Sequence, residues 1–153
     1  MSGARILLVE DDAILRDLLR RNLEARQHLV FIAEDAHTAL TALRATRFDL
    51  VMLDINLPDQ TGWEVLRIAQ REGCLLPQML GDAGPQLPVV AISAVRASLS
   101  RLKEFPLLAY LPKPFPIEAL VRLAEEAGQR RRVSNAGNSV QVRHQPPPNT
   151  HRS

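Results

Sequence analysis

The sequence predicts an α/β fold in which a doubly wound, five-stranded parallel sheet carries helices on both faces. Short apolar runs alternate with helical patterns over residues 1–128, and this alternation is typical of β-α-β units. The runs are almost entirely apolar, as in strands that are covered on both faces. The length of 153 residues suits one domain with its own hydrophobic core.

Five runs of β-branched residues and leucine predict the strands. In chain order they cover residues 5–9, 29–33, 49–53, 88–92 and 107–111. Ligands of doubly wound folds lie beyond the carboxyl ends of the strands. The residues that follow these five runs are therefore where we expect the functional site.

Helical patterns fill the intervals between the strands. The predicted helices cover residues 13–25, 36–46, a segment that begins at 61, 97–104 and 116–127. Asp12 and Asp35 precede apolar stripes and predict N-caps. Thr61 and Glu64 have the spacing of a capping box, in which each side chain bonds the other's backbone N–H. Gly128 predicts the end of the last helix.

Composition indicates a globular protein of a reducing compartment. Hydrophobic residues make up 46% and charged residues 24% of the chain, which excludes disorder throughout. The single cysteine, Cys74, excludes a disulfide framework and a Cys-rich zinc site. No apolar run approaches the roughly 18 residues of a membrane span, so we expect a cytoplasmic protein without membrane contacts.

The end of the chain differs from the rest. Residues 129–153 hold five arginines, no acid and three consecutive prolines. A segment of this composition buries too little apolar surface to become ordered. We therefore expect a domain over residues 1–128 and a basic, disordered tail over 129–153, which is either merely solvated or a weak, non-specific contact for nucleic acid.

Charged and hydroxyl side chains follow the predicted strands. They are Glu10, Asp11, Asp12, Asp54, Ser93 and Lys113. Converging carboxylates repel one another unless a cation lies among them, and oxygen ligands beside a phosphate suit Mg²⁺. A hydroxyl and an ammonium would face that phosphate from the other side. The set predicts a phosphoryl-transfer site in which a carboxylate is the nucleophile.

At these residues the sequence resembles the receiver domain of two-component response regulators. The resemblance covers about residues 4–128 and depends on four blocks in the same order, ILLVEDD, LVMLDINLPDQTGWEVL, VVAISA and YLPKPF. It implies a flavodoxin-like strand order, 2-1-3-4-5. It also implies that Asp54 is the phosphoacceptor, because Pro58 and Gly62 follow it at the family's spacing.

The resemblance implies a set of Mg²⁺ ligands as well. The acidic pair of the family stands five residues before a helical arginine, here Arg16, which selects Glu10 and Asp11. Asp11 would bind Mg²⁺ directly and Glu10 through water. The Asp54 carboxylate and the backbone carbonyl of Asn56 would complete the protein ligands, and Asp12 remains the helix cap.

Three further positions match the family's switch and sensing residues. Ser93 holds the place of the switch hydroxyl, Tyr110 that of the switch aromatic residue and Lys113 that of the phosphate-sensing lysine. The bond from Lys113 to Pro114 is cis in the family. The chain contains 17 arginines and only two lysines. A lysine at 113 therefore indicates that this position needs a compact positive charge.

The chain departs from the family pattern between Asp54 and Ser93. These residues are 39 positions apart, more than is usual, and the excess lies in GCLLPQMLGDAGPQLP. Its glycines and prolines predict a surface loop. The helix over 97–104, part of the family's output face, is predicted to be short.

The function that the resemblance implies is phosphoacceptance in a two-component phosphorelay. Asp54 would take a phosphoryl group from a phosphohistidine of a sensor histidine kinase or phosphotransfer protein in a Mg²⁺-dependent step. Because no output domain follows residue 128, we expect a single-domain regulator that signals through a protein target without specific DNA binding. It would catalyse only its own phosphorylation and slow dephosphorylation.

Two alternatives remain open at this point. Mg²⁺-dependent phosphohydrolases with an aspartate nucleophile usually carry a second aspartate two residues later, where this chain has Asn56. A pseudo-receiver that binds partners without phosphorylation would normally lack one of the acids or the lysine. All of these are present here.

Four other residues with reactive or aromatic side chains are predicted to have structural roles. His28 and His37 lack partners at metal-ligand spacing, and we expect both to be exposed in a helix or turn. Trp63 is expected to pack at the start of the third helix. Cys74 is expected to be an inert thiol.

Overall fold

Five parallel strands form the middle layer of the molecule in the order β2-β1-β3-β4-β5. They are β1 (Arg5–Val9), β2 (Leu29–Ala33), β3 (Leu50–Asp54), β4 (Val89–Ser93) and β5 (Ala109–Pro112). This computed structural model describes residues 3–75, 87–105 and 107–142, with side chains as far as Gln129 apart from that of Leu99. The predicted fold class and strand order are confirmed.

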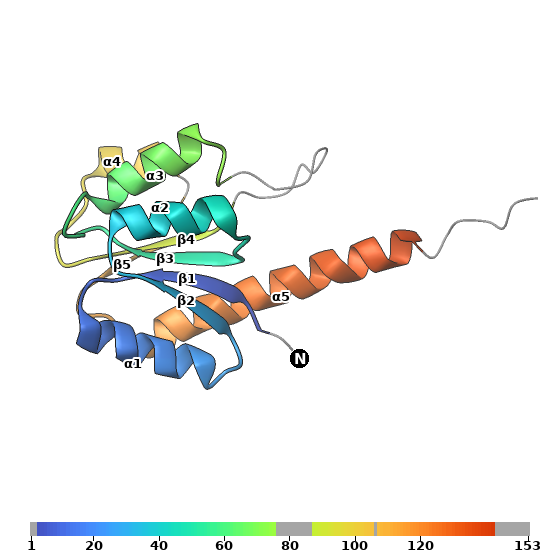
Figure 1. Cartoon of the computed structure of the whole chain (residues 1–153). Helices are drawn as coiled ribbons and strands as arrows, with labels where there is room; N and C mark the ends of the chain where they lie inside the picture. The colour runs from blue at the N-terminus through green and yellow to red at the C-terminus, as the bar shows by residue number, and fades with distance from the viewer. Residues whose placement is uncertain (1–2, 76–86, 106, 143–153) are drawn as a thin grey trace, which may run out of the picture.

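Helices cover both faces of the sheet (Figure 1). They are α1 (Ala13–Glu24), α2 (Ala36–Ala45), α3 (Gly62–Arg71), α4 (Leu99–Glu104) and α5 (Ile117–Val142). Helices α1 and α5 lie on one face, and α2, α3 and α4 lie on the other. None of the helices in the described ranges is long and apolar enough to cross a membrane.

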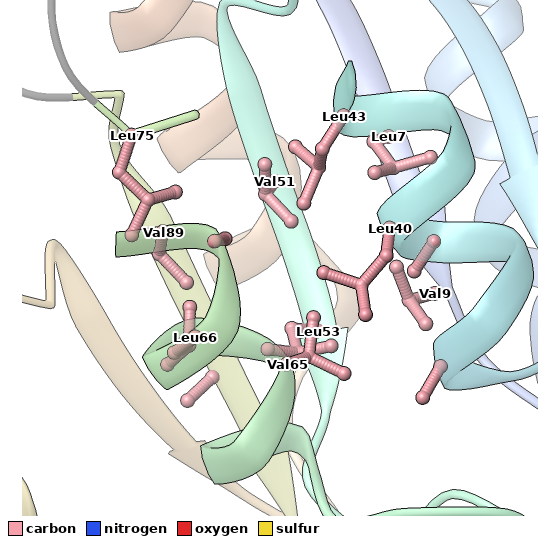
Figure 2. Packing of buried hydrophobic residues seen from close by; sticks show 14 of the residues in the cluster. Leu7, Val9, Leu40, Leu43, Val51, Leu53, Val65, Leu66, Leu75 and Val89 are labelled. Atoms are coloured by element: carbon pink, nitrogen blue, oxygen red, sulfur yellow. The ribbon is translucent and has the colours of Figure 1, made fainter. Parts of the chain in front are cut away.

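Successive side chains of the central strand β3 point alternately into two hydrophobic cores, one on each face of the sheet. Val51 and Leu53 face α2 and α3, whereas Leu50 and Met52 face α1 and α5. Figure 2 shows the first of these cores, in which the packed side chains of the two helices include Leu40, Leu43, Val65 and Leu66. Burial of one such side chain stabilises the fold by about 1.5–3 kcal/mol. The end of β3, which carries Asp54, is thus held from both faces.

The strand register places the predicted site residues at one edge of the sheet. Val9 pairs with Leu53, so the next residues along each strand, Glu10 and Asp54, are neighbours. Chain order reverses between β1 and β3, and such switch points are where doubly wound folds bind ligands.

The predicted helix caps are present. The Asp12 carboxylate accepts hydrogen bonds from the backbone N–H groups of Ile14 and Leu15, at 2.9 and 3.3 Å. Asp35 caps α2 and Thr61 caps α3 in the same way. The predicted reciprocal bond from Glu64 is replaced by an ion pair between Glu64 and Arg67.

The predicted end of the last helix at Gly128 is wrong, because α5 continues to Val142. Gly128 does not have the positive φ of a helix-ending glycine. It is buried against Ala4, where an added Cβ would lie 3.4 Å from the Ala4 backbone nitrogen. Residues 129–142, predicted as disordered, are helical, and the three arginines at the start of this segment are good helix formers. The rest of the predicted tail, 143–153, lies outside the described residues.

The predicted exposure of His28 is also wrong. This side chain is only 4% exposed, and its Nδ1 accepts a hydrogen bond from the Ala4 backbone N–H at 2.9 Å. Its Nε2 lies 3.3 Å from an Oε1 of Glu125 on α5. The pairing of Arg5 with Leu29 brings His28 beneath the start of β1, which no local pattern around His28 indicates.

The structure also places the other three residues that were predicted to have structural roles, His37, Trp63 and Cys74. His37 is exposed, as expected. Trp63 is buried and stacks on Phe105, with ring centroids 6.0 Å apart, which confirms its packing role. Cys74 is half-buried, and burial raises the pKa of its thiol. Most of the predicted surface loop, residues 76–86, lies outside the described part of the chain.

Candidate phosphoryl-transfer site

Three carboxylates converge where β1 and β3 end. Ligand oxygens of Glu10, Asp11 and Asp54 all lie within 4.8 Å of one another. Glu10 and Asp54 are buried and Asp11 is exposed. The Asp12 carboxylate instead caps α1, so the structure separates the predicted acidic pair from the predicted cap.

Lys113 lies between two of these carboxylates. Its Nζ is 3.0 Å from Oδ2 of Asp54 and 3.3 Å from Oε2 of Glu10. Burial alone would lower the pKa of this amine, but the hydrogen bond to Asp54 and the charge of Glu10 raise it above its usual value. The backbone N–H of Lys113 donates to the Ser93 carbonyl oxygen at 2.8 Å, and the Lys113–Pro114 bond is cis, as expected.

The cluster carries more negative charge than Lys113 offsets. Burial raises the pKa of Glu10 to about 7, and the hydrogen bond to Asp54 and the charge of Asp54 act in the same direction. A buried carboxylate with so high a pKa is destabilised in its ionised form. Three carboxylate oxygens at this spacing match the hard oxygen ligands of Mg²⁺, so the donor set fits the predicted cation.

The β3–α3 loop, residues 55–61, closes tightly beside Asp54. The backbone N–H of Asn56 donates to Oδ1 of Asp54 at 2.9 Å, and Asn56 forms an isolated antiparallel bridge with Thr61. Gly62 donates to the Ile55 carbonyl at 2.7 Å. An added Cβ on Gly62 would lie 2.8 Å from the Asp54 carbonyl oxygen, closer than real Cβ contacts. The predicted glycine is therefore required by the approach of α3 to the end of β3.

The hydroxyl groups of the two predicted switch residues, Ser93 and Tyr110, hydrogen-bond to the same backbone carbonyl oxygen. The Ser93 hydroxyl donates to the Val95 carbonyl oxygen at 2.9 Å and accepts from the Val95 N–H at 3.1 Å. The Tyr110 hydroxyl donates to the same oxygen and accepts from the Ala97 N–H. Within the described residues, both hydroxyls are thus occupied by the loop after β4 rather than by Asp54.

Two residues that sequence patterns did not assign to the site are bonded to its loops. Nη1 of Arg16 donates to the Glu10 carbonyl oxygen at 3.1 Å, and its Nη2 pairs with Glu34 at 3.3 Å. Asp59 accepts backbone hydrogen bonds from the first turn of α2. The position of Arg16 in the family pattern was a usable signal, whereas the partners of Asp59 in α2 lie more than 20 residues away in sequence and leave no local signal.

Comparisons with known proteins identify the family of this chain. A family model described as the response regulator receiver domain matches residues 6–125. Response regulator MprA of Mycobacterium bovis is 31% identical over 143 residues, 92% of this chain and 57% of that protein. A probable transcriptional regulatory protein of Picosynechococcus is 33% identical over 127 residues, 77% of this chain and 46% of that protein. The chain spans about half the length of these curated relatives.

A solved structure has the same architecture. A CheY-like response regulator receiver domain protein from Methanospirillum hungatei superposes with a TM-score of 0.70 and 28% identity, and the match covers 87% of this chain and 99% of that one. The family model, the relatives and this fold agree with the resemblance that the four sequence blocks carry. The chain belongs to the response regulator receiver domain family.

Proposed function

We propose that Asp54 accepts a phosphoryl group from the phosphohistidine of a sensor histidine kinase or phosphotransfer protein. The observation that carries the proposal is the position of Asp54. It is a buried carboxylate that contacts Lys113 at 3.0 Å and shares one 4.8 Å cluster with Glu10 and Asp11. A carboxylate oxygen would form the bond to phosphorus while the bond from phosphorus to the histidine nitrogen breaks, and the imidazole leaves.

The residues around Asp54 have complementary tasks in this step. The Asn56 N–H holds one carboxylate oxygen in place, which limits the orientations of the nucleophile. Lys113 supplies a positive charge beside the oxygens of the phosphoryl group. Glu10, Asp11, Asp54 and the Asn56 carbonyl would hold Mg²⁺. When bound, Mg²⁺ neutralises negative charge on the phosphoryl oxygens.

Signalling would follow from a rearrangement of the loop after β4. Ser93 and Tyr110 both bond the Val95 carbonyl oxygen here. A phosphoryl group on Asp54 offers the Ser93 hydroxyl a charged acceptor, and hydrogen bonds to charged groups are stronger than those to neutral ones. We propose that this competition moves the loop and changes contacts with a downstream protein, without specific binding of DNA.

A phosphohydrolase reaction is a weaker candidate. Such enzymes usually place a second carboxylic acid two residues after the nucleophile, and this position holds Asn56. An amide neither gives nor takes a proton in this pH range, so it cannot serve as a general acid or base. We therefore propose self-catalysed phosphorylation and slow dephosphorylation rather than enzymatic turnover.

The test is incubation with a small phosphodonor and Mg²⁺, followed by intact mass. One hydroxylamine-labile phosphoryl group is expected on the wild type and none on Asp54→Asn. The control variant Asp17→Asn changes a carboxylate on α1 that pairs with Arg20 and Arg21 and should be labelled normally. Undiminished labelling of Asp54→Asn would refute the proposal.

A further inference from the structure

Asp59 connects the β3–α3 loop, which follows Asp54, to α2, the helix between β2 and β3. One carboxylate oxygen accepts from the Ala36 N–H at 2.9 Å, and the other accepts from the His37 N–H at 3.1 Å. The first oxygen also accepts from the Gln60 N–H at 3.0 Å. The carboxylate is therefore bound both to its own loop and to the first turn of α2.

Helix α2 already has its own cap. Asp35 accepts a hydrogen bond from the Thr38 N–H at 2.7 Å, which is the usual N-cap contact. Asp59 accepts hydrogen bonds from the two preceding N–H groups of the helix, those of Ala36 and His37. The first N–H groups of a helix have no partner within the helix itself. The second acid thus adds a long-range connection to a helix that a local residue already caps.

The base and the tip of the β3–α3 loop are held in different ways. Ile55, at the base, is buried, and its carbonyl accepts from the Gly62 N–H at 2.7 Å. Asn56 and residues 58–61 are exposed, and Leu57 is half-buried. At its base the loop is closed by the Asn56–Thr61 bridge. At its tip, residues 58–60 are exposed, so apolar burial contributes little to their placement. The tip is held instead by the hydrogen bonds of the Asp59 carboxylate to α2.

We propose that Asp59 is a positioning residue that holds the β3–α3 loop against α2 and thereby places the Asn56 carbonyl and the Asp54 carboxylate for the incoming cation. The inference depends on the proposed function, because it gives the loop a task only if Asp54 and Asn56 act together. Groups that orient metal ligands typically change metal affinity about 10-fold or more when they are removed. A comparable effect is expected here.

Asp35 provides a matched control for Asp59. Both carboxylates cap the same helix, and removal of either is expected to cost about 1 kcal/mol of stability. Only Asp59 belongs to the loop that carries Asn56. In Asp59→Ala, the affinity for Mg²⁺ measured by titration calorimetry should fall about 10-fold, whereas Asp35→Ala should retain the affinity of the wild type.

Two further measurements separate positioning from a structural role. Hydrogen exchange of the loop amides should be faster in Asp59→Ala than in Asp35→Ala, although both variants should unfold at similar urea concentrations. Asp59→Asn keeps one acceptor oxygen and should restore part of the Mg²⁺ affinity. If Asp59→Ala does not fold, the Mg²⁺ affinity of Asp59→Asn provides the test instead.

The outcomes distinguish this inference from the proposed function. Equal Mg²⁺ affinities of the wild type and both Asp59 variants would overturn the positioning role while Asp54 labelling stays intact. Equal losses in the Asp59 and Asp35 variants would also overturn it and indicate simple capping. A wild type that neither binds Mg²⁺ nor accepts phosphate would instead refute the proposed function.

Discussion

Replacement of Glu10 by glutamine should remove a pH dependence of stability that originates in the carboxylate cluster. The folded protein raises the pKa of Glu10 from 4.5 to about 7, so the native state binds a proton that the unfolded state has already released. The stability associated with this proton is fully present below pH 4.5 and is lost as the pH rises through 7. The metal-free protein should therefore weaken between weakly acidic and alkaline pH.

The size of the effect follows from the shift. One pKa unit corresponds to about 1.4 kcal/mol, so the ionised form of Glu10 costs about 3 kcal/mol at high pH. Between about pH 5.5 and 8, the loss in the free energy of unfolding should be roughly 2 kcal/mol. A glutamine side chain cannot titrate, so the Glu10→Gln variant should lack this part of the pH dependence.

Urea denaturation followed by Trp63 fluorescence measures the effect, because the single tryptophan is buried. Glu24→Gln, which removes an exposed glutamate from α1, is the control and should keep the slope of the wild type. Added Mg²⁺ should stabilise the wild type more at pH 8 than at pH 5.5, because protons compete with the cation. Parallel pH profiles of wild type and Glu10→Gln would refute the reasoning.

Three other predictions concern the site and the chain end. Asp11→Asn should weaken Mg²⁺ binding in calorimetry more than Asp12→Asn, which should instead cost about 1 kcal/mol of stability as a lost cap; equal losses of affinity would contradict the assignment. Gly62→Ala should destabilise the protein by about 1–3 kcal/mol in urea, because its Cβ would overlap the Asp54 carbonyl; an unchanged midpoint would count against this contact. A chain that ends at Gln129 should fold and be phosphorylated at the full-length rate, with at most a loss of weak, salt-sensitive nucleic-acid binding. A large drop in that rate would mean that the tail supports the receiver, and binding of specific DNA at high salt would contradict signalling through protein contacts.

Features that depend on neighbouring residues were predictable from the sequence. The first two strands have the predicted bounds, because an apolar run identifies a strand without knowledge of its partners. The predicted cover on both faces is wrong for β2, which lies at the edge of the sheet and leaves Leu29 and Phe31 exposed. The caps formed by Asp12 and Asp35 are equally local, since the bonded N–H groups lie within three residues. The order of the four sequence blocks was sufficient to indicate the family. The catalytic and switch roles of individual residues stay predictions.

Features that depend on contacts between distant segments became evident only from the folded chain. The environment of His28 is created by Ala4 and Glu125, and Gly128 packs against Ala4 within α5 instead of ending the helix. The bonds of Asp59 to α2 likewise join segments that are 22 and 23 residues apart. In each case the local pattern favours an exposed turn, a helix end or a plain loop. The sheet register brings the partner segments close enough for burial and hydrogen bonding to outweigh that local preference.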